Sequence, residues 1–93
     1  MQIDPKLTAL LEQAVEEITT SKPAFTNVAK ELVTAAFGTV LRAETLFEKR
    51  VAGNAEMRAF VGKGRDQVYA TLFISHGVTE ETTQEILSFL IAP

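Results

Sequence analysis

The stretch from Pro23 to Ala52 contains no helix breaker stronger than Gly38, and this long helical pattern most constrains the fold. Within it Ala29, Ala36 and Ala43 recur every seven residues, which places them along one side of a helix. Larger apolar residues flank this seam, namely Leu32, Leu46, Val33, Val40 and Phe47. A seam of small residues predicts that a neighbouring helix approaches closely.

The middle of this helix is apolar or small nearly all round its axis. Phe37 and Leu41 fall outside the alanine seam, so the residues from 36 to 41 are apolar or small nearly all round the axis. A helix that is apolar all round is normally buried all round. A chain of 93 residues forms one domain with a thin core and has few spare elements to cover a second side. We therefore expect a second chain to complete the fold.

Helix boundary signals divide the rest of the chain. Asp4 is a candidate N-cap and Pro5 suits the first helical position, whereas Pro23 ends the first helical pattern. Asn54 and Thr79 are candidate N-caps of two later helices, and glycines at 53 and 77 suit the left-handed position after a helix. The expected fold is an all-α, antiparallel four-helix bundle in a single domain. Its helices are expected near residues 5–20, 23–52, 54–76 and 79–91.

The segment "FVGKGRDQVY", residues 60 to 69, sets two glycines around a lysine inside this pattern. It lacks the spacing and hydroxyl of a P-loop and the three glycines of a dinucleotide fingerprint. Lys63 and Arg65 remain a weak candidate for an anion site built on backbone N–H groups. A chain break with Asp66 as N-cap is one alternative. We favour a continuous helix, because the apolar stripe keeps its phase through the segment and includes Gly64.

The motifs for other chemistries are weak. "ISHGVTEETTQEIL" resembles the spacing of a helix-turn-helix, but carboxylates on the expected recognition face would repel phosphates. His76 is the only histidine, so no site with two histidine ligands can form within one chain. Three carboxylate pairs stand four residues apart at 12 and 16, 44 and 48, and 81 and 85, and we interpret them as solvated faces. We expect no metal, no cofactor and no enzymatic activity.

The composition limits the cellular compartments and the classes of partner that suit this chain. The chain has no cysteine, which suits a reducing compartment, and no apolar run approaches the ~20 residues that span a bilayer. No basic segment precedes an early apolar stretch, so we expect no signal peptide, no membrane association and a cytoplasmic location. The net charge is −3, with the acidic excess at the two ends and a mildly basic middle. That bias is small for a nucleic-acid binder.

These observations favour a non-enzymatic adaptor or regulatory protein that binds protein and acts as a homodimer or larger oligomer. The expected interface residues are Ala36, Phe37, Leu41, Tyr69, Phe73, Phe89 and Leu90. Two alternatives stay open. A nucleic-acid-binding regulator would use the basic middle, and a carrier of an apolar ligand would use Phe37, Phe60, Tyr69 and Phe73 as pocket walls.

Overall fold

The computed structural model describes residues 4–51 and 53–90, and the side chains of residues 50, 51, 55, 57–65 and 90 lie outside that description. The described chain is all-helical and contains no strand. Its elements are α1 (Pro5–Ser21), a 3-10 helix η1 (Pro23–Val28), α2 (Ala29–Val51), α3 (Ala55–Ile74) and α4 (Glu80–Leu90). The expected number and order of the α-helices are confirmed.

The start of the second helix differs from the expectation. Pro23 does begin a helical segment, but residues 23 to 28 are a 3-10 helix, and the α-helix begins only at Ala29. In η1 the hydroxyl of Thr26 donates to the carbonyl of Pro23 at 2.7 Å. The ammonium of Lys22 lies 5.6 Å from the centre of the Phe25 ring, which packs against the core. This 3-10 segment, with its local contacts, leads into α2.

The junction between α3 and α4 follows the pattern expected from Gly77. The backbone nitrogen of Val78 donates to the carbonyl of Phe73 at 3.2 Å, and that of Gly77 donates to Ile74 at 3.0 Å. These bonds form a Schellman motif, and Gly77 has the positive φ of 106° that the motif requires. The turn itself takes residues 75–77, so α3 ends two residues before the expected boundary.

The core gathers side chains from all four α-helices. Ile18, Val40, Phe73 and Ile86 are almost completely buried. On α2 the buried residues form one stripe that includes Ala29 and Ala36, so the seam of small residues does face the core. Residues 60 to 69 lie within α3, which confirms a continuous helix through both glycines. The expected place of Gly64 on the core side falls outside the described side chains.

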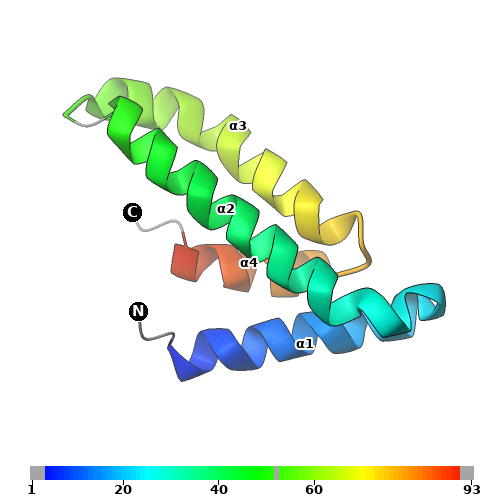
Figure 1. The fold of residues 1–93 in the computed structure, drawn as a ribbon. Helices are drawn as coiled ribbons and strands as arrows, with labels where there is room; N and C mark the ends of the chain where they lie inside the picture. The colour runs from blue at the N-terminus through cyan, green and yellow to red at the C-terminus, as the bar shows by residue number, and fades with distance from the viewer. Residues whose placement is uncertain (1–3, 52, 91–93) are drawn as a thin grey trace.

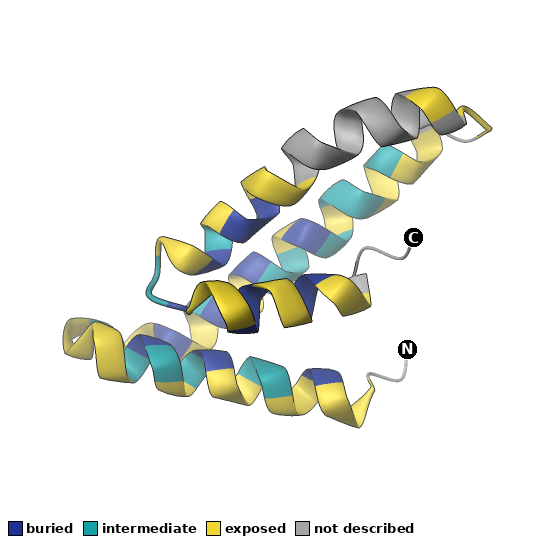
Figure 2. Cartoon of the chain, turned by 180° about the vertical axis from the view of Figure 1, so that it is seen from behind, coloured by how far each residue is buried: buried dark blue, intermediate teal, exposed yellow. Residues whose placement is uncertain are grey.

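The helices form two pairs that cross obliquely (Figure 1). One pair is α1 with α4, and the other is the hairpin of α2 and α3, whose turn extends beyond α1 and α4. We call the outer part of this hairpin, residues 41–51 and 53–66, the arm. None of the described side chains in the arm is fully buried, whereas buried residues are frequent in the rest of the hairpin (Figure 2).

No helix in the described part of the chain is both long enough and apolar enough to cross a membrane.

Candidate functional site

The carboxylate of Glu17 joins α1 to the start of α4. One oxygen accepts hydrogen bonds from the backbone nitrogen of Thr79 at 2.9 Å and from its hydroxyl at 3.0 Å. The other oxygen accepts from the hydroxyl of Thr82 at 2.6 Å and from the amide of Gln13 at 2.9 Å. Thr79 caps α4 as expected, because its hydroxyl accepts from the backbone nitrogen of Thr82 at 3.3 Å. Glu17 therefore extends the cap across two helices.

This environment shifts the acidity of Glu17. Partial burial acts to raise the pKa, because it penalises the charged form. The hydrogen bonds from Thr82, Gln13 and Thr79 act in the opposite direction, and together they hold the pKa of Glu17 below its ordinary value. The group is therefore an ionised structural acceptor at neutral pH.

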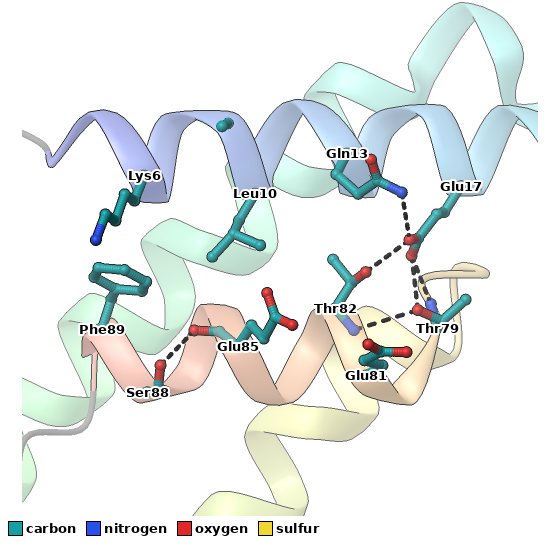
Figure 3. Close-up of a pocket in the computed structure, with 11 residues that line it drawn as sticks. Lys6, Leu10, Gln13, Glu17, Thr79, Glu81, Thr82, Glu85, Ser88 and Phe89 are labelled. Carbon is teal, nitrogen blue, oxygen red and sulfur yellow. Dashed lines mark hydrogen bonds between the residues drawn. The ribbon is translucent and has the colours of Figure 1, made fainter.

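A groove of about 810 Å³ runs from Glu17 along the seam between α1 and α4 (Figure 3). Leu10 supplies apolar surface midway along the groove, and Phe89, which is 41% exposed, does so at the far end beside Lys6. The carboxylates of Glu81 and Glu85 line the α4 side, and both residues are exposed. We call this feature the α1–α4 groove; three carboxylates line it, together with the single ammonium group of Lys6.

The arm offers a second exposed surface. At its base the hydroxyl of Tyr69 donates to the carboxylate of Glu44 at 3.2 Å and so ties α3 to α2. Farther out Leu46 is 57% exposed, while Leu41 and Phe47 are half-buried. Two helices alone can cover only the sides that face each other, so the outer sides of these residues stay in contact with solvent.

The expected interface residues separate into two groups. Ala36, Tyr69 and Phe73 lie in the core of the chain itself, with 6%, 5% and 1% of their surface exposed. Their apolar character is explained by helices of the same chain, so a partner cannot reach them in this fold, and the expectation needs correction for these three. Phe37 and Leu41 are half-buried and Phe89 is exposed. The side chain of Leu90 falls outside the described part.

The expected pocket for an apolar ligand also needs correction. Two of its four walls, Tyr69 and Phe73, are core residues, and the side chain of Phe60 is not described. Phe37 does line an open apolar groove of about 540 Å³ between α1 and α2. Leu11, Val15 and Val33 form the rest of its apolar lining.

The remaining candidates are His76, the basic pair at 63 and 65, and the carboxylate pair on α4. His76 lies in the turn after α3 and is half-buried, while the side chains of Lys63 and Arg65 are outside the described part. Among the described residues no group of three or more acidic, histidine or cysteine side chains is arranged to hold a metal ion. The pair Glu81 and Glu85 is exposed and borders the α1–α4 groove, as a solvated face would.

Sequence reasoning missed Glu17. Glu12 and Glu16 stand four residues apart and so form a recognisable carboxylate pair, but Glu17 has no such local signal. Its partner Thr79 stands 62 residues away, and only packing of α1 against α4 brings the two together. The one available clue was Thr79 as an expected N-cap, since an exposed cap can take a further acceptor.

Comparison with protein-family models, with curated proteins and with solved structures finds no match for this chain.

Proposed function

We propose that this chain is a non-enzymatic helical adaptor or regulatory protein that acts as a homo-oligomer, and that the arm is its association surface. The single observation that supports this most is the position of the arm beyond α1 and α4 (Figure 1). In the described residues no third helix of the chain covers the arm, although the arm carries Leu41, Leu46 and Phe47. A second chain would supply the missing cover and complete an antiparallel helical bundle.

Burial of apolar side chains would contribute to such an association. Full burial of one leucine or phenylalanine side chain contributes about 1.5 to 3 kcal/mol. A dimer with a dissociation constant near 1 μM requires about 8 kcal/mol, after the entropic costs of association are met. The partly exposed apolar side chains of the arm supply part of this free energy, and further contacts in the interface must supply the rest. Absence of cysteine makes a reducing compartment such as the cytoplasm the setting we propose.

Sedimentation velocity at micromolar concentrations tests the proposal. The wild-type chain of 10.2 kDa should sediment as a dimer or a larger species. Leu46→Glu should weaken the association at least tenfold, because it places a charge where a partner would exclude water. Val28→Glu is the matched control, since Val28 is 45% exposed but lies in η1, away from the arm. A wild-type chain that stays monomeric would contradict the proposal.

The apolar groove between α1 and α2 favours a second candidate function, the carriage of an apolar small molecule. Its walls are mostly apolar, and such grooves often bind ligands through a few placed polar groups. Solvent extraction of the purified protein followed by mass spectrometry tests this candidate. A ligand released from the wild type and lost in Phe37→Asp would support it, and an empty extract would oppose it.

A further inference from the structure

The groove between α1 and α2, which we call the α1–α2 groove, has an apolar floor and a polar rim. Val33 is buried, and Leu11, Val15 and Phe37 are half-buried. The polar side chains that line the same groove are all exposed, and they are Thr8, Glu12, Glu16, Lys30 and Thr34. A ligand that matches this groove has an apolar body for the floor and a polar head for the rim.

The rim carries more negative than positive charge. α1 contributes the carboxylates of Glu12 and Glu16, and α2 contributes the ammonium of Lys30. Within the described part of the chain, the side chains of these three residues have no hydrogen-bond or ion-pair partner. All three charges are therefore open to a ligand. A positively charged head meets two opposite charges and one like charge, whereas a negatively charged head meets the reverse.

The spacing of the two carboxylates suits an ammonium group. Glu12 and Glu16 stand four residues apart within α1, so their side chains are neighbours on the helix surface. A primary ammonium has three N–H donors and no acceptor, so carboxylates one turn apart can both accept from it. An ionised carboxylate head has acceptors only, which match Lys30 alone and are repelled by both glutamates.

We propose that the α1–α2 groove binds a primary amine with an apolar body. The body packs on Leu11, Val15 and Phe37, and the ammonium donates to Glu12 and Glu16. The inference rests on the second candidate function, because it assumes that the groove carries a small apolar molecule, and it adds the chemical class of that molecule. The volume of about 540 Å³ lies within the range of about 300 to 1,000 Å³ that is usual for small-molecule pockets.

Three probes with the same apolar chain and different heads test the chemical class. Decylammonium, decanol and decanoate are titrated at neutral pH, below the concentrations at which they form micelles, while the backbone amide signals are followed by NMR. Decylammonium should bind most tightly and decanoate most weakly, with shifts concentrated on the lining of the α1–α2 groove. Equal affinities would overturn the proposal and leave the carrier function standing. If no probe shifts these signals, the carrier function itself fails.

Matched variants identify the groups responsible, with circular dichroism to verify the fold. Glu12→Gln with Glu16→Gln should weaken decylammonium binding about fivefold, as expected for the loss of two exposed ion pairs, and should change decanol binding less than about twofold. The control, Glu81→Gln with Glu85→Gln, makes the same charge change at the same spacing on α4, outside this groove. It should leave the binding of both probes unchanged.

Lys30→Gln supplies a measurement of opposite sign. It removes the one like charge that an ammonium head meets, so decylammonium should bind more tightly and decanoate more weakly than to the wild type. If the α4 control weakens decylammonium binding as much as the α1 pair does, the net charge of the chain and not the rim of the groove attracts the amine. That result, or shifts centred on the α1–α4 groove, would overturn the proposal.

Discussion

The carboxylate of Glu17 in α1 accepts both the backbone N–H and the hydroxyl of Thr79, the residue that caps α4, although 62 residues separate them. A cap is usually a local device, formed by one side chain and the backbone of the same helix. Here the first helix of the chain completes the cap of the last one. The α1–α4 pairing is therefore fixed by polar contacts as well as by the core.

Glu17→Ala should lower the free energy of unfolding by about 1 to 2 kcal/mol, because several hydrogen-bond donors lose a charged acceptor while water replaces it in part. For a chain of this size that corresponds to a fall in Tm of several degrees. Urea denaturation measures the change. Glu16→Ala removes the neighbouring exposed carboxylate and should have little effect; equal losses in the two variants would contradict the role of Glu17.

The same contact makes stability depend on pH. The pKa of Glu17 is lower in the folded chain than its ordinary value of about 4.5, so the folded state favours the ionised form. Its stabilising contribution is fully present above pH 4.5 and is lost as the pH falls through the lower folded-state pKa. The difference in unfolding free energy between wild type and Glu17→Gln should shrink over that acidic range. A difference that is constant with pH would exclude this linkage.

Two adjacent threonines should respond in opposite directions to valine. The hydroxyl of Thr83 is buried without a hydrogen-bond partner, so Thr83→Val should stabilise the fold by about 1 kcal/mol. The hydroxyl of Thr82 donates to Glu17 at 2.6 Å, so Thr82→Val should destabilise it by a similar amount. Both changes have the same shape and helix propensity cost. Thermal unfolding of the pair provides the measurement, and a shared sign would refute the assignment.

Glycine at 77 should be less replaceable than glycine at 53. Both have positive φ, at 106° and 78°, so alanine is strained at either position by about 1 kcal/mol or more. A Cβ at 77 would in addition overlap the hydroxyl of Ser21, which donates to the carbonyl of Gly77 at 3.0 Å, whereas at 53 it would meet no atom within 4 Å. Chemical denaturation should therefore show a larger loss for Gly77→Ala than for Gly53→Ala.

The phase of α3 leads to a prediction for its two glycines, Gly62 and Gly64. The apolar stripe read from the sequence includes Gly64 but not Gly62. Gly64→Leu should therefore disrupt packing much more than Gly62→Leu, by a difference of about 1 to 3 kcal/mol typical of overpacking. Urea denaturation of the two variants measures it. Equal tolerance would show that neither glycine faces a close neighbour.

The sequence determined the features that depend on residues within about one helical turn. Asp4, Thr79 and Gly77 predicted caps and helix ends because capping hydrogen bonds and positive φ are local properties. The periodicity of the apolar residues is also a local property, and it predicted that α3 continues through its two glycines. A helical segment begins at Pro23 as expected, but the sequence does not indicate that its first six residues form a 3-10 helix.

Tertiary structure alone decided which apolar side chains are covered. Tyr69, Phe73 and Leu46 are all large apolar residues of the α2–α3 hairpin, yet the first two lie in the core and the third is exposed. The difference arises because α1 and α4 cross only the inner half of the hairpin. The same crossing brings Glu17 to Thr79. Periodicity gives the side of a helix that is apolar, but the crossing of helix pairs determines how far along that side another helix reaches.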